Sequence, residues 1–129
     1  MAIEFTVILE NRPGTLAHLG QTLGEAGINI DAIHQISRAT DSIVQFVPAD
    51  PAGVEQALSA GKISFTRREV LIVDVMDQPG TLGDVAMVMA DAGVNIDSLY
   101  LMNSGTVIFG VDDLDGAKQV AAGMAVRVR

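Results

Sequence analysis

The chain of 129 residues contains no cysteine. Disulfides, thiolate nucleophiles and cysteine-ligated zinc or iron–sulfur sites are therefore excluded together, and an intracellular compartment fits this composition. No apolar run approaches the ~20 residues of a membrane-spanning helix, and Met1–Glu4 lacks the features of a secretory signal. We expect a cytoplasmic protein that has no membrane partner.

Basic residues are few, with 8 Lys and Arg against 16 Asp and Glu and a net charge of −8. The acidic excess is even along the chain: residues 1–66 carry 3 basic and 7 acidic side chains, and residues 67–129 carry 5 and 9. The only basic doublet, Arg67-Arg68, is followed at once by Glu69. Because phosphate binding needs clustered positive charge, we expect no nucleic-acid partner.

The chain does contain an internal repeat. Nine identities share one offset of 66 residues: Pro13-Gly14-Thr15-Leu16 with Pro79-Gly80-Thr81-Leu82, Ala26-Gly27 with Ala92-Gly93, and Asn29-Ile30-Asp31 with Asn95-Ile96-Asp97. Such a fixed register indicates two copies of one unit. Gly53 and Gln56 match Gly116 and Gln119 at an offset of 63, so the second copy is three residues shorter in the intervening turn region.

Each copy begins with a predicted strand and helix. The strands, Phe5–Leu9 and Val70–Val75, are apolar and lead toward a Pro-Gly pair that ends them. Apolar residues then recur at helical spacing, as Leu16, Leu19 and Leu23 in one copy and Leu82, Val85 and Met89 in the other. Gly27 and Gly93 follow where a left-handed helix cap is expected.

The rest of each copy predicts a hairpin, a second helix and a last strand. Ile28, Ile30, Ala32 and Ile36 are expected to share the core face of the second strand. Turns at Arg38–Asp41 and Asn103–Gly105 lead into strands Ile43–Val47 and Val107–Val111. Second helices start at Asp50-Pro51 and within Asp112–Asp115, and the last strands are Ile63–Thr66 and Ala125–Val128.

The order βαββαβ, twice, predicts an α+β protein of two tandem ferredoxin-like domains, residues 1–67 and 68–129, each an antiparallel sheet with both helices on one face. Only Arg67-Arg68-Glu69 separate the last strand of one copy from the first strand of the next, which is too short for a free linker. A domain of ~60 residues is marginal alone, so we expect the copies to pack together and the chain to form a homodimer or larger oligomer.

The repeated segments resemble the signature of ACT domains. Glu10-Asn11-Arg12-Pro13-Gly14 with Gly27-Ile28-Asn29-Ile30, and Asp77-Gln78-Pro79-Gly80 with Gly93-Val94-Asn95-Ile96, look like its loop and second strand, and the resemblance covers nearly the whole chain. It implies a regulatory protein that binds a free amino acid as an allosteric effector, not an enzyme, with a separate metabolic enzyme as a further partner. It implies no cofactor.

Within that family the chain resembles the serine-sensing domain of 3-phosphoglycerate dehydrogenase. The two Asn residues of that sensor correspond to Asn11 and Asn29, and in the second copy to Asp77 and Asn95. The sensor's histidine, two residues before its loop Asn, is replaced here by Leu9 and Val75, which disfavours serine as the ligand.

The residues of these loops suit an amino acid. The start of a helix offers free N–H groups and a positive dipole end for the α-carboxylate, and glycine allows close approach. The ionised Asp77 carboxylate can only accept hydrogen bonds and favours the ammonium group of the ligand, whereas the Asn11 carboxamide can donate or accept. The two sites are therefore expected to bind the ligand unequally. The predicted ligand-binding residues are Asn11, Arg12, Pro13, Gly14, Thr15, Leu16, Asn29 and Ile30, and Asp77, Gln78, Pro79, Gly80, Thr81, Leu82, Asn95 and Ile96.

Several alternatives remain at this point. Asn or Asp before a helix is often only a turn or cap residue, and Asn29 and Asn95 can serve local backbone. The copies could be an interaction subunit with vestigial sites. An acylphosphatase-like hydrolase using Arg12 and Asn29 is a weaker option, since its arginine loop is not present and fold alone decides nothing.

No metal site is expected. His18 corresponds to Asp84 and is expected to be exposed, and His34 corresponds to Tyr100 and is expected to pack or lie at an interface. Neither has a second histidine at helical spacing. Asp112–Gly116 lacks the alternating ligands and closing Glu of a calcium loop.

Overall fold

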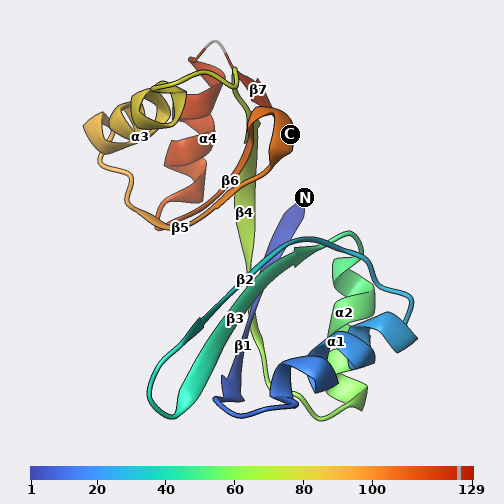
Figure 1. The fold of residues 1–129 in the computed structure, drawn as a ribbon. Coiled ribbons are helices and arrows are strands. Elements are labelled where there is room, and N and C mark those ends of the chain that lie inside the picture. Colours follow the sequence, from blue (N-terminus) through green and yellow to red (C-terminus); the bar gives the residue numbers. More distant parts are fainter. Residues whose placement is uncertain (125) are drawn as a thin grey trace. The chain divides into compact units, whose positions relative to one another are not determined.

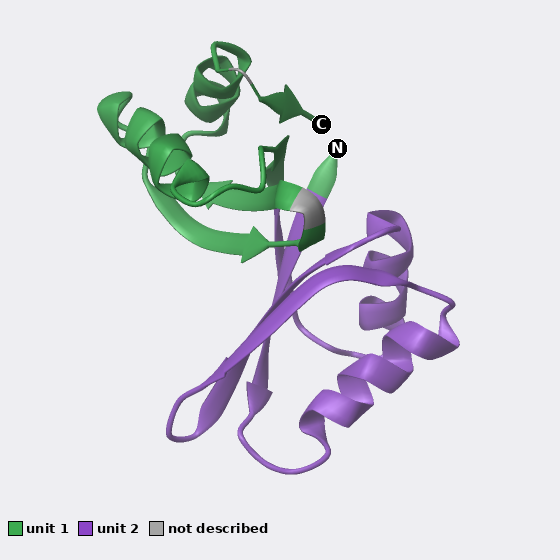
Figure 2. Cartoon of the chain, turned by 45° about the horizontal axis from the view of Figure 1, so that its top comes forward, with its two compact units in different colours: residues 1–2, 69–129 green, residues 3–68 purple. Residues whose placement is uncertain are grey.

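The computed structural model describes residues 1–124 and 126–129, and it divides into two compact units, residues 3–68 and residues 1–2 with 69–129 (Figure 2). The elements in chain order are β1 (Ala2–Glu10), α1 (Thr15–Glu25), β2 (Ile30–Ser37), β3 (Asp41–Pro48), α2 (Pro51–Ala60), β4 (Thr66–Asp74), α3 (Thr81–Asp91), β5 (Ile96–Leu101), the 3-10 turn η1 (Asn103–Gly105), β6 (Thr106–Val111), α4 (Leu114–Ala122) and β7 (Arg127–Val128) (Figure 1). The predicted α+β fold with two ferredoxin-like copies is confirmed.

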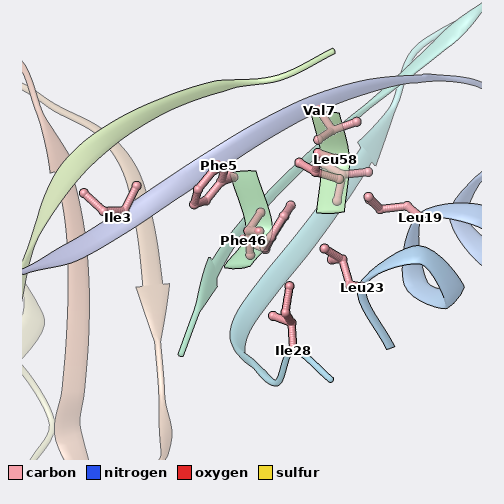
Figure 3. Packing of buried hydrophobic residues seen from close by; sticks show 10 residues of the cluster. Ile3, Phe5, Val7, Leu19, Leu23, Ile28, Phe46 and Leu58 are labelled. Carbon is pink, nitrogen blue, oxygen red and sulfur yellow. The ribbon is translucent and has the colours of Figure 1, made fainter. Parts of the chain in front are cut away.

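In residues 3–68, β3 lies between β1 and β2 and pairs antiparallel with both. One face of this sheet carries the core, in which Phe5 and Phe46 stack with ring centroids 5.6 Å apart. Leu19 and Leu23 from α1 and Leu58 from α2 belong to the same buried cluster (Figure 3). Both helices therefore lie on the same face of the sheet, as expected.

The second unit repeats this plan. In the described residues, β6 pairs with β5 and β4, and β7 pairs with the other side of β4. Its core includes Val73, Phe109 and Met89. Ala125, at the start of the predicted last strand, lies outside the described residues, and β7 is limited to Arg127–Val128.

The first residue of each predicted helical triad is not core. Leu19, Leu23, Val85 and Met89 are buried, but Leu16 is 45% exposed and Leu82 is 39% exposed. Both leucines occupy the second position of their helices, next to the preceding loop. The 3.6-residue spacing correctly predicts which side of the helix faces the sheet. It cannot predict how far the sheet extends beneath the helix.

A β-bulge overturns the predicted core face of β2. Between Ile30 and Ala32 the register with β3 shifts, after which Ile33 lies opposite the core residue Phe46 and Ile36 lies opposite Ile43. Opposed residues share a face, so Ala32 and Ile36 project from the side away from the helices. Ile36 is accordingly 59% exposed instead of buried.

The expected last strand Ile63–Thr66 does not form as predicted. Ile63 and Phe65 precede the strand and pack against the core, and β4 begins only at Thr66. It then runs without interruption to Asp74, so Arg67-Arg68-Glu69 is part of a strand instead of a connection. Ile63 and Phe65 cover the core but do not pair with a neighbouring strand. The local sequence does not distinguish this arrangement from a strand.

Candidate functional site

The loops between the first strand and first helix of each copy end in the same backbone conformation. Gly14 and Gly80 have φ of 92° and 91°, a left-handed conformation that glycine adopts without strain, and neither α1 nor α3 has a side-chain cap. By contrast, Asp50 and Asp113 cap α2 and α4 by accepting hydrogen bonds from Gly53 and Gly116. The first turns of α1 and α3 therefore present amide groups that no capping side chain satisfies.

In the first copy this loop is tied to the β2–β3 hairpin. The Asn11 backbone amide donates to the Thr40 carbonyl over 3.1 Å, and its side-chain amide donates to the Arg38 carbonyl over 2.9 Å. Thr15 closes the loop from the other side, donating to the Glu10 carbonyl over 2.8 Å. Arg12 forms an exposed ion pair with the Glu10 carboxylate. The predicted Asn11 carboxamide thus holds the hairpin.

In the second copy a backbone hydrogen bond ties the loop to the hairpin. The Val75 amide donates to the Gly105 carbonyl over 2.9 Å, and Gly105 has φ of 82°. A Cβ at Gly105 would lie 2.2 Å from the Val75 carbonyl oxygen, so only glycine fits this close approach. Asp77 is exposed, and its carboxylate makes no hydrogen bond within residues 1–124 and 126–129.

A small cavity of about 80 Å³ opens beside Asp77. Its lining includes four of the predicted residues, Asp77, Gln78, Thr81 and Leu82. It also includes residues that sequence reasoning missed: Val75, Met76, Leu101, Gly105 and Val107. The three-residue shortening of the hairpin was the available signal, because it brings Gly105 against the loop.

Asp74 fixes the strand end from which this loop departs. Arg129 donates from Nε to the Asp74 carboxylate over 3.0 Å, and Thr106 donates from its hydroxyl over 2.8 Å. The Arg129 hydrogen bond, followed by that of Thr106, holds the pKa of the Asp74 carboxyl below its ordinary value. The carboxylate form is therefore favoured at the base of the loop.

Asn29 and Asn95 lie at the opposite ends of the first helices from their own loops. An 11-residue helix spans about 16 Å, so one copy does not bring its Asn to its loop. The Asn29 carbonyl accepts from Ala49 over 3.0 Å, and the Asn95 carbonyl accepts from Asp112 over 3.1 Å. Both side chains are exposed. The neighbouring Ile30 and Ile96 pack against the cores of their copies.

Pro13 and Pro79 lie in exposed turns just before the glycines that start the helices. His18 is exposed, and His34 bonds to Gln45 over 2.8 Å. Both members of the basic doublet face carboxylates, Arg67 that of Glu55 and Arg68 that of Glu4.

In the part of the chain that the structure describes, no three His, Cys, Asp or Glu side chains gather as metal ligands would. No described helix combines the length and apolar character needed to cross a bilayer.

The fold is shared with several solved structures. A protein of Bacteroides thetaiotaomicron is 23% identical, with a TM-score of 0.92 over 99% of this chain and 91% of that one. The regulatory subunit of aspartate kinase from Thermus thermophilus is 17% identical, with a TM-score of 0.73 over 94% of this chain and 88% of that one. The corresponding subunit from Thermus flavus is 17% identical, with a TM-score of 0.67 over 94% and 90%.

Among curated proteins, none matches the sequence of this chain significantly. The sequence does match the family model described as an ACT domain pair, over residues 1–126. This match spans both copies and all of the loops described above, and the chain therefore belongs to the ACT domain pair family.

Proposed function

We propose that this protein is a regulatory protein that binds a free amino acid and has no catalytic activity. The observation that carries the proposal is the cavity at the Asp77–Leu82 loop, where an exposed carboxylate and the uncapped start of α3 lie together. An amino acid needs both of these features, one for its ammonium group and one for its carboxylate.

In this proposal the ligand carboxylate binds at Gly80–Leu82 through the backbone amides of Gly80 and Leu82, because the helix start has a positive dipole end and the Thr81 amide already donates to the Gln78 carbonyl over 3.2 Å. Asp77 accepts from the ammonium group, and charge-assisted bonds of this kind are the stronger class. The second copy is therefore the principal site. In the first copy the side chains of Asn11 and Thr15 already bond to the hairpin and the loop, which leaves the backbone of Gly14 and Leu16 as the ligand-facing part.

In this proposal Asn29 and Asn95 complete a site that includes the loop of a second chain. Since each lies about 16 Å from its own loop, a ligand that touches both an Asn and a loop would lie between two chains of a homo-oligomer. Effector binding then changes how the chains associate. That change is the proposed allosteric signal to a separate metabolic enzyme.

The regulatory assignment rests on the ACT domain pair family and on this site. Among proteins of similar fold are regulatory subunits of aspartate kinase, which is in keeping with an enzyme partner. An acylphosphatase-like reaction finds less support: the Arg12 guanidinium pairs with Glu10, and Asn29 lies at the far end of α1. These two residues do not converge on one substrate.

A thermal-shift screen of the twenty amino acids tests the proposal. A ligand present at about 100 times its dissociation constant stabilises the folded state by about 2.7 kcal/mol. We expect at least one amino acid to raise the melting temperature, and Asp77→Asn and Gly80→Val to reduce that rise. Asn29→Ala and Asn95→Ala should each weaken binding by about 0.5–3 kcal/mol. The absence of any shift with all twenty would overturn the proposal.

A further inference from the structure

The cavity of the second copy is mainly apolar. Beside the polar residues of its loop it is lined by Val75, Met76, Leu82, Leu101 and Val107. Met76 is 66% exposed and Leu101 is 65% exposed, although both are large apolar side chains. Exposed apolar side chains gathered around a hollow are a feature of binding sites.

The strand register places Leu101 at one side of this hollow. It lies opposite Val107 in the β5–β6 ladder, and Val107 is a core residue on the helix side of the sheet. Leu101 therefore projects from the same face, toward the start of α3 where Leu82 lies. The two leucines and Val107 line the hollow from a strand, a helix and the sheet beneath.

The first copy has different chemistry at the corresponding positions. Gln35 takes the place of Leu101 and lies opposite Val44, as Leu101 lies opposite Val107. Glu10 takes the place of Met76, and Arg12 takes the place of Gln78. Polar and charged groups thus surround the first loop, where the second copy has apolar side chains.

We infer that the second copy selects an amino acid with a short, branched aliphatic side chain, such as valine, leucine or isoleucine. This inference rests on the proposed function and names the ligand class of that same site. The Asp77 carboxylate, which has no hydrogen-bond partner in the described chain, accepts from the ligand ammonium group. The aliphatic group enters between Leu82 and Leu101.

The cavity is small and partly open to solvent. A cavity of about 150 Å³ accommodates benzene, and a water molecule occupies about 30 Å³ of liquid. The 80 Å³ beside Asp77 therefore favours a compact group of three or four carbon atoms over a bulkier aromatic ring. Each methylene group removed from water adds about fourfold in affinity, so alanine binds more weakly than valine or leucine.

Calorimetry on the full chain with valine, leucine, isoleucine, alanine, glutamate, lysine and phenylalanine tests this inference. We expect the three branched amino acids to bind at least about tenfold more tightly than alanine, which corresponds to two methylene groups. Leu101→Gln copies the residue of the first copy at an exposed position, so the fold is retained. It should remove most of that preference and leave alanine affinity within about twofold. Gln35→Leu is the matched control and should leave the preference unchanged.

The outcomes separate the two proposals. If glutamate, lysine or phenylalanine binds most tightly and Asp77→Asn weakens that binding, the amino-acid site stands and the aliphatic selection is wrong. The selection is also wrong if Leu101→Gln leaves the ratio of leucine to alanine affinity unchanged while its melting temperature shows a folded protein. If no amino acid binds, the proposed function and the selection fail together.

Discussion

The guanidinium of Arg68 lies 2.8 Å from the carboxylate of Glu4, whose side chain is only 1% exposed. This pair joins the beginning of β4 to β1 inside the unit of residues 3–68. Its neighbour Arg67 pairs instead with the exposed Glu55. Adjacent arginines of the only basic doublet therefore have different energetic roles.

Replacing Arg68 with Ala should destabilise the protein by about 1.5–3 kcal/mol, because the buried Glu4 carboxylate then loses a charged hydrogen-bond donor 2.8 Å away. Arg67→Ala should cost no more than about 1 kcal/mol, since exposed ion pairs contribute little. Urea denaturation at neutral pH measures both values. Equal losses in the two variants would show that burial of Glu4 does not control the energetics of this strand.

The different loop attachments predict unequal responses to loop substitutions. Asn11→Ala removes the hydrogen bond to the Arg38 carbonyl and should destabilise the protein by about 0.5–1.5 kcal/mol. Asp77→Ala removes a carboxylate with no hydrogen bond in the described chain, so the free energy of unfolding without ligand should change by less than about 0.5 kcal/mol. Chemical denaturation of both variants checks the contrast. A larger loss for Asp77→Ala would contradict it.

Gly80, just before α3, and Gly83, inside it, predict opposite effects of substitution by alanine on stability. A Cβ at either Gly80 or Gly83 would meet nothing within 4 Å, but Gly80 has φ of 91° and Gly83 lies inside the helix. Gly80→Ala should therefore destabilise by about 1–2 kcal/mol. Gly83→Ala should stabilise by about 0.5–1 kcal/mol. Thermal unfolding of the two variants gives opposite shifts if this is correct, and shifts of the same sign would refute it.

The environment of Asp74 predicts that the stability of the protein depends on pH in the acid range. Its pKa in the folded protein is lowered from the ordinary 3.8, first by the Arg129 hydrogen bond and next by Thr106. A lowered folded pKa means that its stabilising contribution is complete above pH ~4 and is lost as the pH falls through the folded value. The stability difference between the native chain and Asp74→Asn should therefore be present at pH 6 and shrink below pH ~4.

Urea midpoints measured from pH 6 down to pH 2.5 test this dependence. Arg129→Ala removes the largest cause of the lowered pKa and should weaken the acid dependence. Arg127→Ala is the control, because Arg127 contributes only through a smaller charge interaction. An acid dependence that is the same in both arginine variants would exclude the Arg129 hydrogen bond as its source.

Local sequence determined much of this protein. The duplication, the βαββαβ order and the starts of the helices are all readable because they depend on neighbouring residues. Asp50 before Pro51 requires a helix start, and Gly27 and Gly93 adopt the expected left-handed conformation, with φ of 72° and 75°. The loops around Gly14 and Gly80 were likewise found from the Pro-Gly pairs alone.

Tertiary structure decided the features that depend on distant segments. The bulge after Ile30 is a property of β2 and β3 together, and it moved Ile36 to the exposed face. The continuity of β4 through Arg67–Glu69 follows from strand pairing, which no short stretch of sequence encodes.

The same reason separates the two loops. Asn11 and Asp77 occupy equivalent positions in the repeat, yet among the residues that the structure describes only the Asn11 side chain bonds to its hairpin, which is three residues longer. The shorter hairpin instead brings Gly105 against Val75 and leaves the hollow beside Asp77. The sequence by itself determined where the two loops are. The packing of each hairpin against its loop decided which loop has a hollow beside it, because that contact joins residues about 30 positions apart.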